Sequence, residues 1–257
     1  AGSGPPASGP DPQVELNAAV RSPGNLVLPD VTGKVNSNTT WVVDDDKAQC
    51  PDANFGSIQK AVDFASPWDS IVICAGTYKE SSTPTYNAGS PIATGSMNGL
   101  TITKPLKIKG AGADKVTIMP DAGVVGESLA GVTPYLRDAG GNVITVSRQS
   151  LGSTDTNEMF VDISGVKVVS GGVYAEAGIA FSNSAGRVSN SIVGPLERAT
   201  STAELAAEPH GWGIIKTNTN LGDGPGTVEN EVTVANSVVT GYQSGGIFID
   251  GARGTDG

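Results

Sequence analysis

The chain has 257 residues, among them 35 glycines and 16 prolines, and only 16% of its residues are charged. This composition favours a turn-rich β protein, and the length allows one β-rich domain with a sizeable core or two smaller ones. The net charge of −10 argues against nucleic-acid binding and against an anionic membrane surface, because no basic face is available to replace phosphate counterions. No apolar run approaches the ~20 residues that a membrane-spanning helix needs, so no such helix is expected.

Residues 1–40 are predicted to form a flexible N-terminal arm. Residues 1–12 are rich in Gly, Pro and Ser and resemble the small-residue start that export and processing leave behind. Residues 13–40 contain short apolar patches without a sustained period, as expected of an extended segment. The folded domain is therefore expected to comprise residues 41–257.

A short strand is predicted at residues 41–43, and it leads directly into Asp44, Asp45 and Asp46. Clustered carboxylate oxygens suit Ca²⁺, which is the one candidate cofactor. The three adjacent aspartates do not match the spaced aspartates of a helix–loop–helix calcium site. A solvated turn is the alternative interpretation.

Cys50 and Cys74 are the only cysteines of the chain. The absence of a Cys-x-x-Cys pair and the single histidine argue against a zinc site. We expect a disulfide rather than two free thiols. A disulfide implies an oxidising compartment, so the sequence favours a secreted or periplasmic protein.

The stretch FGSIQKAVDFASPWDSIVIC at residues 55–74 predicts a helix followed by a buried strand. Ser57 can cap the helix, which is predicted over residues 57–66 and ends before Pro67. Its apolar positions follow the i, i+3, i+4, i+7 spacing of one helix face: Ile58, Ala61, Val62 and Ala65.

Beyond residue 98 the chain predicts many short strands separated by Gly, Asn and Asp turns. Three segments align as copies of one strand: residues 178–184, 213–219 and 246–252. A second pair, residues 188–193 and 234–239, repeats an Asn-Ser motif, and asparagines at equivalent turns can form a hydrogen-bonded ladder along a stack. Such repeats are typical of stacked coils that share one core.

The order of the helix, ASPWDSIVI, GTY and ITKPLKIKGAG resembles the N-terminal entry of the pectin-lyase-like right-handed parallel β-helix superfamily. The resemblance covers residues 41–120 and 160–253. It implies an all-β solenoid, a right-handed parallel β-helix, with a short helix that caps its N-terminal end. The superfamily contains polysaccharide lyases and glycoside hydrolases but also adhesins and tailspikes, so the fold alone does not decide the activity. The chain has no clear match to the calcium-and-arginine set of pectate lyases or to the aspartate motifs of polygalacturonase-type hydrolases.

Polar residues of the aligned strands form the first candidate site. One aligned position holds Ser182, Thr217 and Asp250, and the next holds Asn183 and Asn218. Stacked hydroxyls, amides and a carboxylate suit the hydroxyl groups of a sugar. The alternative is the ordinary polar face of a solenoid.

Charged candidates complete the predicted catalytic set. Arg253 follows the last aligned strand and can hold a uronate carboxylate, while Lys216, which aligns with Phe181 and Ile249, is a candidate base. Asp223 and Glu229 are a candidate carboxylate pair for glycoside hydrolysis, and Asp250 is a further candidate for the same role.

His210 and Trp212 lie together at the end of an insert and are typical of an acid–base group beside a sugar-stacking ring. A surface histidine beside a core tryptophan is the alternative.

The sequence therefore predicts a secreted polysaccharide-active protein, either a lyase or a glycoside hydrolase, acting on an extracellular glycan such as a uronic-acid polymer. The alternative is a non-catalytic β-helix protein for surface binding or assembly. The strong strand near residue 250 has no cap after it. We expect either a longer solenoid or another polypeptide to cover that end.

Overall fold

The computed structural model describes residues 39–82, 98–121, 141–147, 159–173, 175–182, 184–196, 211–217 and 231–250. The predicted arm at residues 1–40 lies almost wholly outside these ranges. The strands of the described ranges form three sheets, and every pairing within them is parallel. The prediction of a parallel β protein is confirmed.

The first sheet has six strands in spatial order: β1 (Thr40–Val43), β2 (Ser70–Ile73), β5 (Leu106–Gly110), β8 (Phe160–Ser164), β11 (Ala185–Ser189) and β14 (Val232–Ala235). The second has five: β3 (Gly76–Glu80), β6 (Val116–Pro120), β9 (Lys167–Val168), β12 (Ile192–Val193) and β15 (Val238–Val239). The third also has five: β4 (Leu100–Ile102), β7 (Ile144–Ser147), β10 (Ala177–Ser182), β13 (Trp212–Thr217) and β16 (Gly245–Asp250).

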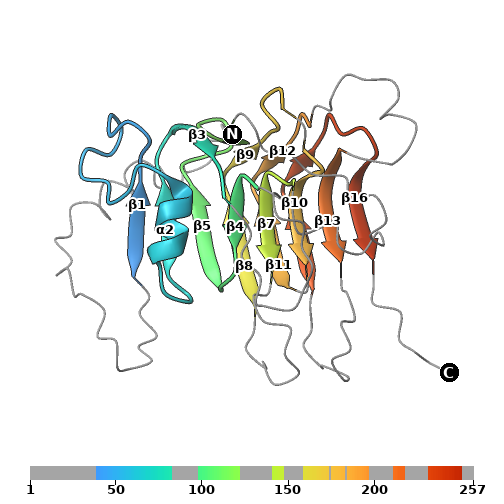
Figure 1. Cartoon of the computed structure of the whole chain (residues 1–257), viewed down its shortest axis with the longest axis horizontal. Coiled ribbons are helices and arrows are strands. Elements are labelled where there is room, and N and C mark those ends of the chain that lie inside the picture. The colour runs from blue at the N-terminus through green and yellow to red at the C-terminus, as the bar shows by residue number, and fades with distance from the viewer. Residues whose placement is uncertain are drawn as a thin grey trace, which may run out of the picture.

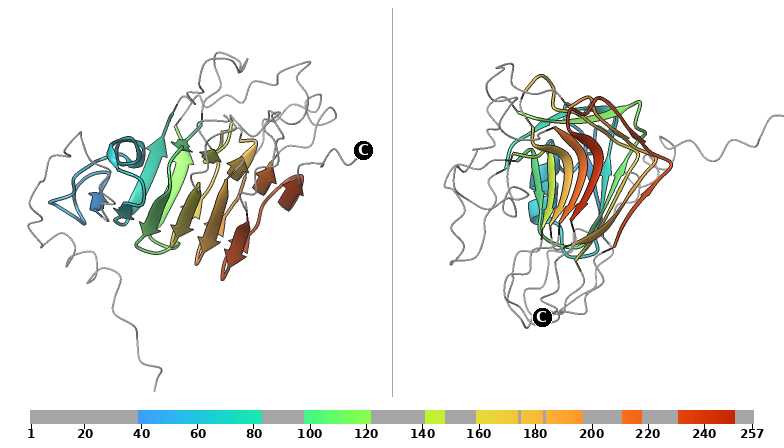
Figure 2. Two further views of the ribbon diagram at one scale, coloured as in Figure 1. Left: turned by 90° about the horizontal axis from the view of Figure 1, so that it is seen from below. Right: turned by 90° about the vertical axis from the view of Figure 1, so that its right-hand side faces the viewer.

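The chain visits these sheets in a fixed cycle. From β2 onward each set of three consecutive strands gives one strand to the first sheet, one to the second and one to the third. Figure 1 shows the resulting row, with β1 at one end and β16 at the other. In Figure 2 the strands of each sheet stack along the same long direction. This cyclic order is compatible with a parallel β-helix.

The core lies between the sheets and is built by period-two alternation. In β5, Leu106 and Ile108 are buried whereas Lys107 and Lys109 are exposed, because successive side chains of a strand point to opposite faces. Parallel register then stacks similar side chains from strand to strand. One such row in the first sheet consists of Ile71, Ile108, Ile163, Val188 and Val234.

The turns between the first and second sheets also repeat. Gly165, Asn190 and Asn236 have positive φ angles of 66°, 48° and 48°, a conformation that Gly and Asn tolerate best. The amide of Ser191 donates to Ser237 Oγ at 3.2 Å along the stack. The predicted ladder of asparagine side chains is therefore corrected: among the described residues serine hydroxyls bond along the stack at these turns, and the asparagines supply the left-handed backbone.

Helix α2 (Ile58–Phe64) occupies the stretch for which the helix was predicted, with Ser57 as its N-cap. It is shorter than the predicted 57–66 because Ala65 is extended and Pro67 disfavours helical geometry in the residue before it. Ile58, Ala61 and Val62 of α2 are buried. Between β1 and β2 the chain gives no strand to the second and third sheets, and α2 packs against their edge strands β3 and β4 as well as against β1 and β2.

The N-terminus of α2 is held by a carboxylate from β3. Glu80, only 3% exposed, accepts hydrogen bonds from Ile58 N at 2.6 Å, from Ser57 Oγ at 2.8 Å and from Gln59 N at 3.2 Å. The first amides of a helix have no partner within the helix, and their partial positive charge favours an anion. Burial raises the pKa of Glu80, and these three donors oppose that rise.

The C-terminal end of α2 is held by Lys104, which lies in the turn after strand β4. Lys104 Nζ donates to the carbonyl oxygens of Asp63 at 3.0 Å and Ala65 at 2.7 Å, which satisfies the C-terminal carbonyls. Burial lowers the pKa of Lys104.

The side chain of Gln59 connects α2 to strand β4. The Gln59 amide accepts from Thr101 N at 2.8 Å and donates to Thr101 O at 3.1 Å. Gln59 therefore pairs with edge strand β4 as the backbone of a neighbouring strand would.

Replacing Glu80 by Ala should destabilise the protein by about 2–3 kcal/mol, because the buried donors of α2 lose a charged acceptor. Lys79→Ala is the matched control, since Lys79 is the exposed neighbour on the same strand. Urea unfolding of both variants measures the difference. Equal stability of the two variants would show that Glu80 does not anchor α2.

Candidate functional site

A row of polar residues runs across the third sheet near the carboxyl ends of its strands. Ser147, Ser182, Thr217 and Asp250 are paired in register from β7 through β10 and β13 to β16. The alignment predicted for Ser182, Thr217 and Asp250 is confirmed at the level of the backbone register. Ser147 was not predicted, because the aligned copies began at residue 178. We call these four residues the polar row.

The polar row contains hydroxyls with unmet hydrogen-bonding capacity. Ser147 is 2% exposed and Thr217 is 6% exposed. The hydroxyl oxygens of both are buried without a hydrogen-bond partner. A buried polar group in this state costs about 1–3 kcal/mol. Between them, Ser182 is partly exposed. Among the described side chains of the row, Ser182 is therefore the one that a ligand can reach, whereas the buried hydroxyls of Ser147 and Thr217 could hydrogen-bond to a buried water.

An aromatic pair lies on β13 and β16 of the same sheet, with Trp212 at the first residue of β13 whereas Thr217 of the polar row is the last. The rings of Trp212 and Phe248 are tilted by 47°, with centroids 4.9 Å apart. Phe248 is 38% exposed and Trp212 is half-buried. Gly245 gives the indole its space, because a Cβ at that position would lie 2.3 Å from a ring atom of Trp212.

Trp212 is not part of the main core. It packs against a separate small cluster of Ala177, Ala180 and Ile215. Phe248 belongs to one of the predicted strand copies but was not predicted as a site residue. The alternation along β16 could have predicted it: Phe248 lies between Ile247 and Ile249, so its side chain points to the opposite face of the sheet from theirs.

Lys216 pairs in register with Phe181 and Ile249, so the predicted alignment holds at this position too. Phe181 is fully buried in the core and Lys216 is only 4% exposed. Its ammonium group donates to Thr217 O at 3.2 Å. The candidate base thus lies in the interior of the sheets, where a polymeric substrate on the outer surface does not reach it.

The remaining predicted residues of the glycan site are not placed by the structure. Asn183, His210, Asn218, Asp223, Glu229 and Arg253 lie outside the described residues. Asp250 is described by its backbone only.

The last strand of the third sheet exposes apolar side chains. Ile247 is 50% exposed and Ile249 is 70% exposed on β16, and Val238 of the neighbouring sheet is 55% exposed. Within the described residues β16 pairs with β13 on one side only. This is the end at which a covering polypeptide was expected.

The predicted disulfide between Cys50 and Cys74 is confirmed, with an S–S distance of 1.99 Å. Both cysteines are buried. The bond points to an oxidising compartment.

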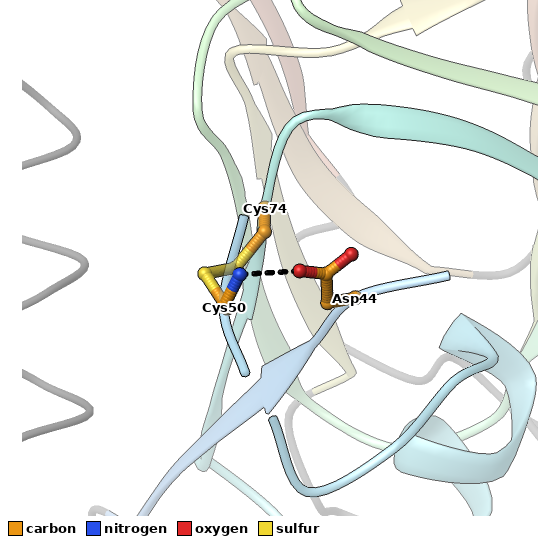
Figure 3. Close-up of side chains that lie close together, drawn as sticks. All are labelled: Asp44, Cys50 and Cys74. Atoms are coloured by element: carbon orange, nitrogen blue, oxygen red, sulfur yellow. Dashed lines mark hydrogen bonds between the residues drawn. A yellow bond between two sulfur atoms is a disulfide. The ribbon is translucent and has the colours of Figure 1, made fainter. Parts of the chain in front are cut away.

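The three adjacent aspartates lie beside this disulfide. Carboxylate oxygens of Asp44, Asp45 and Asp46 all lie within 4.8 Å of one another. Asp44 is fully buried, and Figure 3 shows one of its oxygens bonded to the Cys50 amide and the other turned away from the disulfide. Asp45 and Asp46 are exposed.

Comparison of the chain with known proteins adds no family assignment. No family model matches the chain, and no curated protein is similar to it in sequence. In the described part of the chain, no helix is long and apolar enough to span a membrane.

The buried position of Lys216 can be tested by amine labelling of the native protein. Lys216 should react with an acylating reagent only after denaturation, whereas the exposed Lys79 and Lys115 should react at once. Peptide mass spectrometry measures the three rates. Labelling of Lys216 at the rate of Lys79 would mean that its ammonium group reaches solvent.

Proposed function

We propose that this chain is a right-handed parallel β-helix protein of the pectin-lyase-like kind, acting outside the cytoplasm on a polysaccharide as a lyase or glycoside hydrolase. The fixed cycle of strands through three parallel sheets supports the fold. The disulfide supports an oxidising, extracytoplasmic location. The observation that carries the function is the third sheet, which holds both the polar row and the Trp212–Phe248 pair.

The geometry of the polar row suits an extended ligand. Neighbouring strands repeat at about 4.8 Å, so the row offers hydrogen-bonding groups at regular intervals along the stack. A sugar polymer lying along the stack would meet the partly exposed Ser182, whereas the hydroxyls of Ser147 and Thr217 are buried and would bond to it only after the groups that cover them move aside. The partly exposed rings of Trp212 and Phe248 lie on β13 and β16 of the same sheet and offer apolar surface on which a pyranose ring can stack.

Catalysis in this proposal falls to the charged residues that the sequence predicted. Asp250 continues the polar row, and Arg253 follows it by three positions. An arginine there would hold a uronate carboxylate, and Asp223, Glu229 or His210 would transfer the proton.

A non-catalytic binding or assembly protein is the second candidate. Two observations favour it. Lys216 is buried rather than presented at the surface, and Ile247, Phe248 and Ile249 expose apolar surface at the end of the third sheet. Apolar surface of this kind is typical of a contact with another polypeptide.

A screen of the full chain against uronic-acid and neutral polysaccharides separates the two candidates. Unsaturated oligosaccharides would identify a lyase, and saturated ones a hydrolase. Retention of a polysaccharide without any product would support the binding protein. A result of neither retention nor product from any polymer would contradict both the enzyme and the polysaccharide-binding protein, and would leave assembly with another polypeptide.

Trp212→Ala should weaken binding of the retained polysaccharide about three- to tenfold, because one stacking contact is lost. Phe64→Ala is the control, since Phe64 is an exposed aromatic residue, 51% exposed, on helix α2 at the opposite end of the row of strands. Affinity electrophoresis measures both, with the thermal midpoint as a check on folding. Equal affinities of folded Trp212→Ala and wild-type protein would show that the aromatic pair does not contribute to polysaccharide binding.

A further inference from the structure

The loop that follows β1 concentrates negative charge at one point. Three consecutive carboxylates, Asp44 to Asp46, each place an oxygen within 4.8 Å of the others. Among the described residues no ion pair involves any of them. Lys47 is the nearest basic residue in sequence, and it is exposed with a positive φ of 62°.

Asp44 is the exception among the buried carboxylates of this end of the molecule. Its Oδ2 accepts from Gln49 N at 3.0 Å and from Cys50 N. Its Oδ1 is buried and has no hydrogen-bond partner. In Asp69 and Glu80, by contrast, both carboxylate oxygens accept hydrogen bonds.

Asp45 and Asp46 also accept hydrogen bonds through only one carboxylate oxygen each, among the described residues. Asp45 Oδ2 accepts from Thr77 N at 3.1 Å, and Asp46 Oδ1 accepts from Ala48 N at 2.8 Å. Each carboxylate thus uses one oxygen to fix the loop or join it to β3. The hydrogen bonds of the described residues leave the second oxygen of each aspartate available.

A buried carboxylate oxygen without a donor requires a positive charge or a proton beside it. The two cysteines next to Asp44 cannot supply a metal ligand, because their sulfurs are joined in the disulfide. The other two aspartates can complete a site for a cation made only of oxygen ligands.

We propose that Asp44, Asp45 and Asp46 bind one Ca²⁺ ion, with Asp44 Oδ1 as the buried ligand. Calcium binds oxygen at about 2.3–2.6 Å, so two ligands of one ion lie up to about 5 Å apart. The carboxylate oxygens of the three aspartates lie within 4.8 Å of one another, which is compatible with this range. The exposure of Asp45 and Asp46 lets water complete the six to eight ligands of calcium, whereas magnesium demands a stricter octahedron.

The ion would strengthen the N-terminal end of the sheets. Asp44 directly follows β1, its carboxylate binds the amide of a disulfide cysteine, and Asp45 is bonded to β3 through Thr77. The ion therefore joins β1, the disulfide loop and β3. This role is structural and does not depend on the proposed action on polysaccharides.

The test is calcium titration of the full chain, stripped of metal, by isothermal titration calorimetry. Wild-type protein should bind one Ca²⁺ with a dissociation constant of about 10⁻⁴ to 10⁻³ M or tighter, and Ca²⁺ should raise its thermal midpoint. Asp46→Asn should weaken binding at least about tenfold. This variant folds without difficulty, because Asn keeps the Oδ1 acceptor for Ala48 N.

Asp52→Asn is the matched control, because Asp52 is an exposed aspartate between the same strands β1 and β2 and the change in net charge is equal. It should bind Ca²⁺ as the wild type does. The proposal is overturned if wild-type protein shows no saturable binding up to about 20 mM Ca²⁺. It is equally overturned if Asp46→Asn and Asp52→Asn bind with the same affinity, or if Mg²⁺ binds as tightly as Ca²⁺.

Discussion

The contact between helix α2 and the edge strands β3 and β4 closes one end of the structure, and the rest of the fold depends on it. Parallel sheets leave unpaired backbone groups along an edge strand and an uncovered apolar interior at the end of a stack. Helix α2 covers the interior with Ile58, Ala61 and Val62. Its side chains also satisfy the edge, since Gln59 bonds both backbone groups of Thr101.

The same contact also stabilises helix α2 itself. A helix of two turns is marginal alone, because few of its backbone groups find partners within it. Glu80 binds the amides at the start of α2, and Lys104 binds the carbonyls at its end. Both charges come from the first cycle of strands that the helix covers. Helix and stack therefore stabilise each other, and the two opposite charges also complement the helix dipole.

Most of the repetitive part of the fold could be predicted from the sequence. The Gly-Ile strand copies predicted the register of β10, β13 and β16, because a repeat that stacks in parallel must align its equivalent positions. The i, i+3, i+4, i+7 pattern predicted α2, and the elimination of a zinc site predicted the disulfide. These signals are local or periodic, and they are readable along one chain.

The contacts that were missed are neither local nor periodic. Glu80 lies 22 residues from Ile58, and Lys104 lies 39 residues from Ala65, so no sequence pattern joins them. The burial of Lys216, by contrast, agrees with its periodic position, since the aligned strands already paired it with Phe181 and Ile249. The unpartnered oxygen of Asp44 follows from how the disulfide loop folds back, which the three adjacent aspartates alone did not show.

Amide hydrogen exchange at β4 tests most directly whether α2 takes the place of a missing strand. The measurement compares wild-type protein with Gln59→Ala, resolved to Thr101 and to the distant strand β13. Faster exchange of the Thr101 amide in the variant, with unchanged exchange in β13, is the predicted result, because Gln59 Oε1 is the acceptor of that amide. Unchanged protection of Thr101 would contradict the account, since the edge of the third sheet would then be satisfied without the helix.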